Sequence, residues 1–310
     1  MKLLISLATR NRPARLLETV KRSVALWTHP ETEMVIQTDA DDHATLGALT
    51  DIELPPRVSV NVQRREDTTA AKWNRAATTP ADVYLISGDD EPCVTEGYDS
   101  KILEAAAVFP DNIGMVYGHA SNASFSSLMA VTSRWVDILG YILPEHFPYW
   151  FSDHWIDDIG RITQRIAFAD IRGDQKNIPP TQEMREPGWW ATWFDANYLR
   201  RRAEAQKIID AIEEPEWRKT ILRSHHPLVE YRSRWINDNV RAQSRAMEAS
   251  NNLSLKESRY LRVKNAAFAA LPAILGELPK DEAARYAAML VPPTSIIAPP
   301  QAFAPLQQAS

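Results

Sequence analysis

The fold is decided by the stretch Asp82-Val83-Tyr84-Leu85-Ile86-Ser87-Gly88-Asp89-Asp90-Glu91. Its apolar run is typical of a buried strand, and three consecutive carboxylates and a proline follow that run. Ligands of open α/β sheets bind at the carboxyl ends of the strands, and Mg²⁺ and Mn²⁺ prefer carboxylate oxygens. The stretch therefore predicts a strand that delivers Asp89, Asp90 and Glu91 to a divalent cation; the alternative is an exposed acidic turn.

Short apolar runs alternate with helical patterns over about the first 170 residues. The predicted strands are residues 3–8, 33–38, 58–63, 83–87, 114–117 and 128–132. The predicted helices between them are residues 14–26, 69–77 and 99–108. Alternating βα units of this length predict an α/β domain with a largely parallel sheet.

The pattern changes after about residue 180. Tryptophan is frequent in residues 186–198, and helical periodicity follows in residues 203–212, 217–223, 228–247 and 255–271. The last twenty residues are rich in Pro, Ala and Gln and show no periodicity. We predict an α/β domain over residues 1–180, a smaller all-helical C-terminal domain over 181–290, and a disordered tail over 291–310.

Composition excludes several classes of protein. The chain has 310 residues, is 45% hydrophobic and carries a net charge of −5, so it gives no general attraction for nucleic acid. Its one cysteine, Cys93, excludes a disulfide framework and a cysteine-rich zinc site. The apolar start reads as a first strand, and no apolar run reaches the ~18 residues of a membrane span. We expect a soluble, cytoplasmic protein with no integral membrane contact.

Polar residues gather at the ends of three predicted strands, which would converge at one edge of an open sheet. The segments are Thr9-Arg10-Asn11-Arg12-Pro13, Thr38-Asp39-Ala40-Asp41-Asp42-His43 and Gly88-Asp89-Asp90-Glu91. Lys72 and Asn74 lie on the helix between the second and third segments. Together they supply what a nucleoside diphosphate needs: a base slot, a carboxylate, a cation on the diphosphate and a basic partner.

The order of these segments resembles family 2 glycosyltransferases, which have the type A nucleotide-diphospho-sugar transferase fold. The resemblance covers roughly residues 1–175, and it implies a catalytic type A domain over residues 1–180. It implies that Asp39 holds the nucleotide base and that the acids after the fourth strand bind Mn²⁺ or Mg²⁺. The acidic motif departs from the usual two aspartates spaced by one residue, so the choice among Asp89, Asp90 and Glu91 stays open. The remaining donor-binding candidates are Thr9, Arg10, Arg12, Asp41, Lys72 and Asn74.

A further acidic cluster lies at residues 151–161. Asp153 and Asp157 are spaced i,i+4, share one face of a helix, and follow Ser152, a suitable cap. Acids in a first helical turn are also favoured by the helix dipole alone. In the glycosyltransferases that the chain resembles, an acid here deprotonates the acceptor hydroxyl, so Asp153 is the first candidate base and Asp157 the second. His154 is a candidate metal ligand by the same resemblance.

The resemblance implies a metal-dependent, inverting, hexosyltransferase-like glycosyltransferase that moves a sugar from a nucleotide-diphosphate donor, most often uridine-based, to a hydroxyl acceptor. A nucleotidyltransferase on the same fold and a non-catalytic nucleotide-sugar or polymer-binding module are the alternatives. A modified DNA base is a disfavoured acceptor because the chain is acidic. Its only support is the cluster of Trp189, Trp190 and Trp193 beside the run Arg200–Arg202. We expect the tryptophans to pack in a core and the arginines to lie on an exposed helix face.

Overall fold

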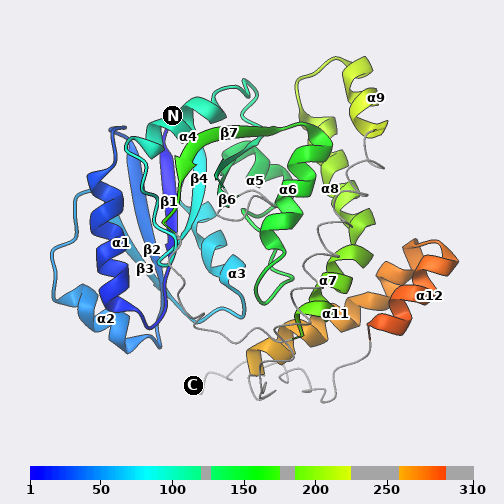
Figure 1. The fold of residues 1–310 in the computed structure, drawn as a ribbon, viewed down its shortest axis with the longest axis horizontal. Coiled ribbons are helices and arrows are strands. Elements are labelled where there is room, and N and C mark those ends of the chain that lie inside the picture. The colour runs from blue at the N-terminus through cyan, green and yellow to red at the C-terminus, as the bar shows by residue number, and fades with distance from the viewer. Residues whose placement is uncertain (120–126, 175–185, 225–257, 291–310) are drawn as a thin grey trace, which may run out of the picture.

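The computed structural model describes residues 1–119, 127–174, 186–224 and 258–290. Its centre is a seven-stranded sheet in the order β3-β2-β1-β4-β6-β5-β7 (Figure 1). The strands are β1 (Leu3–Ala8), β2 (Thr32–Asp39), β3 (Val58–Gln63), β4 (Val83–Gly88), β5 (Met115–His119), β6 (Ser127–Thr132) and β7 (Ile166–Arg172). The predicted helix at 228–247 and the predicted tail at 291–310 lie outside the described residues.

Helices cover both faces of the sheet and continue beyond it. In the first half they are α1 (Pro13–Ala25), α2 (His43–Thr50), α3 (Thr69–Asn74) with the 3₁₀ turn η1 (Arg75–Thr78), α4 (Tyr98–Ala106), α5 (Ser133–Leu139) and α6 (Ser152–Thr163). In the second half they are α7 (Pro187–Ala196), α8 (Tyr198–Ala211), α9 (Glu216–Ser224), α11 (Ser258–Glu277) and α12 (Lys280–Met289). The predicted helical C-terminal part is therefore confirmed for the ranges that the structure describes.

Most strand pairs are parallel, as the alternating pattern predicts. β3, β2, β1 and β4 run parallel to one another, and β5 and β7 are also parallel. β6 is antiparallel to both of its neighbours, β4 and β5. The parallel half matters for function because its carboxyl ends meet at one edge of the sheet.

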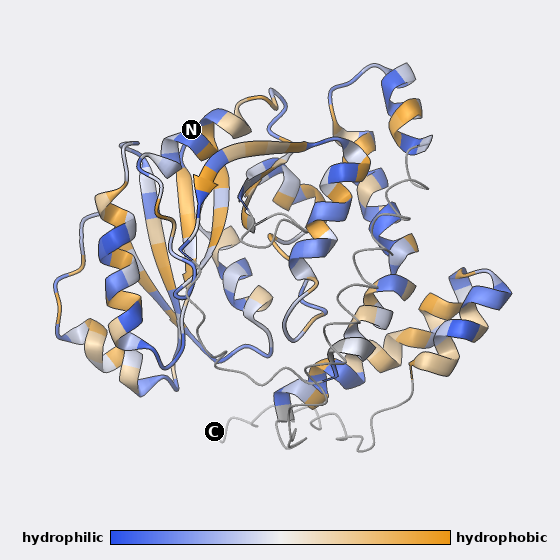
Figure 2. Cartoon of the chain, viewed as in Figure 1, coloured by the Kyte–Doolittle hydropathy of each residue, from blue (hydrophilic) through white to orange (hydrophobic). Residues whose placement is uncertain are grey.

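The central strands are buried on both faces, and their side chains alternate between two apolar cores. Leu3, Ile5 and Leu7 of β1 face the core that includes Leu16 of α1. Leu4, between them, faces the second core, which includes residues of α5 and α6. Figure 2 shows the matching colours: hydrophobic residues run along the central strands, whereas α1 is mixed. Burial on both faces explains why these strands read as continuous apolar runs.

The second core extends from the sheet into the C-terminal helices. Trp190 of α7 and Tyr260 of α11 belong to the same cluster of buried residues as Leu4 of β1, and neither is more than 1% exposed. The side chains that fill this core are mostly aromatic near α6 and α7, where Phe147, Trp155 and Trp190 make edge contacts. Apolar packing therefore crosses residue 180; the predicted domain boundary there stays a prediction.

Among the described residues, five elements were absent from the sequence prediction: α2, α5, β7, α7 and α12. In β7 the side chains of Ala169 and Ile171 are buried, whereas Phe168 and Asp170 are exposed. An exposed phenylalanine and interspersed charges obscure the period-2 signal of this strand. No helix in the described ranges is both long and apolar enough to cross a membrane.

Candidate active site

The ends of three parallel strands place the predicted polar segments together. Ala8 at the end of β1 is paired with Gln37 of β2 on one side and with Gly88 of β4 on the other. The residues that follow, Thr9, Asp39 and Asp89, consequently lie at the same edge of the sheet. Asn11, in the left-handed region at φ 54°, turns the chain back into α1, and its backbone N–H donates to Asp42.

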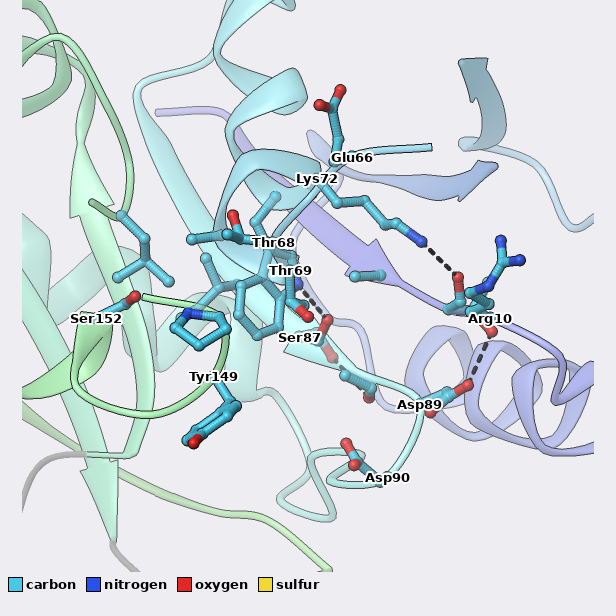
Figure 3. A pocket seen from close by; sticks show the side chains of 18 of the residues that line it. Arg10, Glu66, Thr68, Thr69, Lys72, Ser87, Asp89, Asp90, Tyr149 and Ser152 are labelled. Carbon is cyan, nitrogen blue, oxygen red and sulfur yellow. Dashed lines mark hydrogen bonds between the residues drawn. The ribbon is translucent and has the colours of Figure 1, made fainter. Parts of the chain in front are cut away.

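A cavity of about 620 Å³ opens at this edge. One side is formed by the ends of β1, β2 and β4, and the opposite side by the segment that leads into α6, with Tyr149 and Ser152 (Figure 3). The loop before α3 supplies further lining, and α11 supplies Arg259. The predicted site residues that line the cavity are Thr9, Arg10, Arg12, Asp39, Lys72, Asp89, Asp90, Glu91 and Asp153. Four others, Asp41, Asn74, His154 and Asp157, do not line it.

Asp39 is surrounded by cations. Its side chain is 1% exposed, and Lys72 Nζ and Arg10 Nη1 donate to its Oδ2 at 2.7 and 2.9 Å. Arg75 Nη2 lies 3.4 Å from Oδ1. Burial lowers the pKa of Lys72, an effect that the Asp39 carboxylate only partly offsets. Both oxygens of Asp39 thus bond to protein cations, and a ligand that reaches this end of the cavity meets a fixed ionic cluster.

Asp41 lies at the outer end of the same cluster. Its two carboxylate oxygens accept hydrogen bonds from Arg10 at 2.7 and 3.1 Å, and its side chain is about half exposed. Burial alone would lower the pKa of Arg10, but hydrogen bonds to Asp41 and Asp39 raise it. Asp41 therefore orients Arg10 from outside the cavity.

Asp89 and Asp90 lie on a turn that begins as β4 ends at Gly88. Asp89 is buried: Thr9 Oγ1 donates to its Oδ2 at 2.8 Å, and Arg12 Nη1 donates to its Oδ1 at 3.0 Å. Asp90 is 54% exposed, and its Oδ2 lies 3.5 Å from the same Arg12 nitrogen. Burial raises the pKa of Asp89 although Thr9 and Arg12 pull it down. The sequence left the choice among Asp89, Asp90 and Glu91 open, and in the structure the turn brings Asp90 beside Asp89, where both lie near Arg12 Nη1.

Glu91, the third acid of the motif, packs against a glycine near the end of β7. Its side chain lies against Gly173, where an added Cβ would come within 2.6 Å of Glu91 Cγ. Glycine at position 173 thus makes room for the Glu91 side chain at the cavity wall. Glu91 still lines the cavity.

The acidic turn fits a divalent cation held in the manner of Mg²⁺ or Mn²⁺. No group of three or more His, Cys, Asp and Glu side chains in the described ranges has the geometry of a metal site. Mg²⁺ is commonly bound by one or two carboxylates together with substrate phosphates, rather than by a complete protein cage. The exposed carboxylate of Asp90 next to Asp89 supplies such a partial set of hard oxygen ligands.

Asp153 stands at the start of α6, on the side of the cavity opposite the acidic turn. Phe151, the residue before α6, adopts φ 76°, and the helix begins directly after it. Ser152 Oγ donates a hydrogen bond to Pro144 O. The Asp153 side chain is 29% exposed, and its Oδ1 lies 2.9 Å from His154 Nδ1. Burial acts to raise the pKa of Asp153, but the charge of His154 outweighs it and the pKa is lowered. Asp153 thus lines the cavity, and its pairing with His154 favours the charged form of its carboxyl group.

Asp157 and His154 point into the protein. Asp157 is 2% exposed and accepts a hydrogen bond from Arg161 Nε at 2.8 Å. The His154 ring packs near the rings of Phe151 and Phe194, with centroid distances of 5.8 and 6.2 Å. Asp153 and Asp157 share a helix face, but only the first turn of α6 reaches the cavity.

Asn74 connects two elements around the cavity. Its Oδ1 accepts from the backbone N–H groups of Ile142 and Leu143, and its Nδ2 donates to Leu143 O and to Glu145. The amide therefore fixes α3 to the loop that leads towards Tyr149. This is an indirect position for a residue predicted to bind the donor.

Several lining residues were not predicted from the sequence as site residues. Tyr149 and Trp150 form an aromatic wall before Asp153, with ring centroids 6.3 Å apart. Arg259 comes from α11, whose neighbouring Arg262 donates two hydrogen bonds to Asp67 in the loop before α3. The pattern Tyr-Trp-x-x-Asp was a local signal for the wall, whereas nothing near Arg259 in the sequence indicates the cavity.

The tryptophan cluster packs in the core, as predicted. Trp190 and Trp193 are at most 1% exposed, and Trp189 stacks on Trp193 with centroids 5.7 Å apart. The prediction that the arginine run is an exposed helix face is wrong for Arg201. This side chain is 3% exposed, lies 2.9 Å from Asp158 and stacks over Phe194. A buried acid on α6 is what allows an arginine to sit on the inner face of α8.

Comparison with known proteins identifies the fold. Staphylococcus aureus TarS (residues 1–349) in complex with UDP-GlcNAc superposes with a TM-score of 0.52 at 12% identity, covering 94% of this chain and 88% of that one. The same protein in complex with UDP gives a TM-score of 0.50 at 13% identity over the same shares. The chain has the type A glycosyltransferase fold.

One further solved structure superposes less well, and two searches by sequence found no match. A mannosyltransferase from Pyrobaculum calidifontis, PcManGT, in complex with GDP-Man and Mn²⁺, matches at a TM-score of 0.46 and 14% identity, over 93% of this chain and 86% of that one. No family model matches the sequence, and no curated protein matches it. In this chain the cavity lies at the carboxyl edge of the parallel strands, as the strand-end motifs predict.

Proposed function

We propose that the protein is a glycosyltransferase that uses a nucleotide-diphosphate sugar, depends on a divalent cation and inverts the anomeric configuration. One observation carries this proposal. One cavity is lined both by the acidic turn of Asp89 and Asp90 and by Asp153, whose pKa is lowered by its pairing with His154. A cation-binding edge and a base around one space are what sugar transfer needs, and TarS, which shares the fold, binds UDP-GlcNAc.

The donor would lie along the strand ends. Arg10, Lys72 and the neighbouring acids offer a polar slot for the nucleotide, and a uridine donor is our first choice. Asp89 and Asp90 would hold Mn²⁺ or Mg²⁺ next to the diphosphate. The cation, when bound, neutralises charge on the departing diphosphate as a Lewis acid.

Asp153 would act as the general base. It accepts the proton of the acceptor hydroxyl while that oxygen forms a bond to the anomeric carbon. The bond from that carbon to the diphosphate oxygen breaks in the same step, and the nucleoside diphosphate leaves with the bonding electrons. One displacement on the face opposite the leaving group inverts the configuration.

The aromatic wall favours a sugar-bearing acceptor. Tyr149 and Trp150 are partly exposed, line the cavity, and lie four and three residues before Asp153, respectively. Aromatic side chains combine a large apolar face with a polar edge. A sugar ring can pack its C–H face on such a wall and turn a hydroxyl to Asp153.

The test starts with thermal unfolding in the presence of nucleoside diphosphates and nucleotide sugars, with and without Mn²⁺. A ligand at 100 times its dissociation constant stabilises a protein by ~2.7 kcal/mol. We expect stabilisation by one nucleoside diphosphate that increases with Mn²⁺, followed by release of that diphosphate during turnover. Pyrophosphate release would instead identify a nucleotidyltransferase, and binding without turnover on any acceptor would identify a binding module.

A further inference from the structure

Arg12 occupies the space between the two aspartates that would hold the cation. Its Nη1 lies 3.0 Å from Asp89 Oδ1 and 3.5 Å from Asp90 Oδ2, and its side chain is only 14% exposed. We propose that Arg12 and a divalent cation compete for Asp89 and Asp90, so that the cation binds tightly only when a donor diphosphate draws Arg12 away. This inference rests on the proposed function, because it concerns regulation of the same site.

Asp89 is fixed in place by contacts other than the one to Arg12. Thr9 Oγ1 donates to its carboxylate at 2.8 Å, and Thr19 Oγ1 donates to its backbone carbonyl at 3.2 Å. The side chain is buried, and β4 ends immediately before it. Because Asp89 is held by these contacts, separation of the Arg12–Asp89 ion pair requires movement of the Arg12 side chain.

The backbone of Arg12 is fixed as well. Arg12 is the N-cap residue of α1, its carbonyl accepts from Leu16 N at 2.9 Å, and Pro13 follows at the first helical position. Asn11, just before it, is held by Asp42. The backbone of Arg12 is thus held by α1, so a change in the pairing of Asp89 and Asp90 requires a change in the Arg12 side-chain rotamer.

Arg12 and a divalent cation are both attracted to the carboxylate oxygens of Asp89 and Asp90, but they repel each other. A buried carboxylate is strongly disfavoured without a counter-charge, and Arg12 supplies one when no cation is bound. A guanidinium and a divalent cation a few ångströms apart repel each other. A diphosphate relieves the conflict, because arginine pairs well with phosphate oxygens in a bidentate geometry.

The consequence is linkage between cation and nucleotide. A diphosphate that binds Arg12 frees Asp89 and Asp90, and the cation then binds both the freed carboxylates and the phosphates. By reciprocity the cation must strengthen diphosphate binding by the same factor. The isolated protein would bind Mn²⁺ weakly, and so would not fill its site before the donor arrives.

The experiment measures Mn²⁺ binding directly, by electron paramagnetic resonance of free Mn²⁺, with and without UDP. Without UDP, Arg12→Gln should bind Mn²⁺ at least about fivefold more tightly than the unmodified protein, the lower end of typical coupling between sites. With UDP, the unmodified protein should gain Mn²⁺ affinity by a larger factor than Arg12→Gln does. Arg15→Gln is the matched control: it removes one positive charge from α1, lies outside the cavity lining, and should bind Mn²⁺ as the unmodified protein does.

The possible outcomes separate this inference from the proposed function. Equal Mn²⁺ affinity of Arg12→Gln and the unmodified protein, with UDP still bound, overturns the competition and leaves the glycosyltransferase proposal standing. Absence of both Mn²⁺ and UDP binding overturns both. If Arg12→Gln does not fold, the unmodified protein still decides: Mn²⁺ affinity that is unchanged by UDP contradicts the inference.

Discussion

Lys72 Nζ lies 2.7 Å from Asp39 Oδ2, although the two residues are 33 positions apart and each side chain is at most 9% exposed. The same ammonium donates to Thr9 O at 3.1 Å. One lysine on α3 thus joins the ends of β1 and β2 at the cavity. The ion pair at the cavity end that we assign to the nucleotide is therefore buried and joins two strands. Substitution of Asp39 or Lys72 should change the stability of the protein as well as ligand binding.

Asp39→Asn should destabilise the protein more than Lys72→Met. The first change leaves Arg10, Lys72 and Arg75 around a neutral amide, and loss of a partner from a buried ionic pair typically costs ~3–5 kcal/mol. The second change leaves Asp39 with two arginines, so its cost should be smaller. Urea unfolding of both variants measures the difference, and equal losses would contradict the assignment of Asp39 as the centre of the cluster.

Asp153→Asn and Asp157→Asn should differ in which property they impair: the first should lower turnover, whereas the second should lower stability alone. Loss of a general base should lower turnover per folded molecule by about 10²–10⁴-fold, and loss of the pair with His154 should also lower the melting temperature. Loss of the buried partner of Arg161 should cost ~1–3 kcal/mol of stability and leave turnover per folded molecule near that of the unmodified protein. Turnover and melting of the two variants, measured side by side, test the roles; full turnover by folded Asp153→Asn would refute the base.

The Asp153–His154 pair should make stability fall as the pH rises above 6.5. Burial acts to lower the pKa of His154, but the Asp153 carboxylate more than compensates, so the pKa lies above its ordinary value of 6.5. The stabilisation is complete below pH 6.5, where the unfolded chain is also protonated, and is lost as the pH rises through the raised pKa of the folded protein. The free energy of unfolding of the unmodified protein, minus that of His154→Asn, should shrink across this range. A difference that does not depend on pH would exclude the pair.

The ion pair between Arg201 and Asp158 should hold α8 on α6. Asp158→Asn removes the carboxylate 2.9 Å from Arg201 Nε and leaves this buried arginine with the charge of Asp195 alone, which should cost ~3–5 kcal/mol. Arg201→Leu should be at least as destabilising, because it leaves two buried acids, Asp158 and Asp195, without that cation. Melting temperatures of the two variants decide the point: unchanged stability of either variant would contradict it.

Sequence reasoning located the strand ends because they follow from two simple rules. Apolar runs such as Val83–Ile86 mark buried strands, and parallel strands end at a common edge, so Thr9, Asp39 and Asp89 had to converge. The spacing i,i+4 puts Asp153 and Asp157 on one face of α6. Periodicity does not show which turn of the helix reaches the cavity. Asp153, in the first turn, lines the cavity, whereas Asp157, one turn later, is buried.

Other parts of the site depend on contacts between distant residues. Arg259 reaches the cavity because Arg262, one turn later on α11, is paired with Asp67, 195 positions earlier. The inner position of Arg201 depends on Asp158 in the same way. Such pairings are invisible in one sequence, since each arginine alone resembles an ordinary surface residue.

The apolar core that runs from Leu4 in β1 to Leu271 in α11 has a consequence for biosynthesis. During translation the sheet emerges from the ribosome first. The core on one of its faces is completed only after the residues of α11 and α12 have also emerged. Until then Trp155 and Trp190 would lack part of their packing, a state that favours aggregation or chaperone binding. Truncation before α11 should for the same reason yield insoluble protein rather than a smaller transferase.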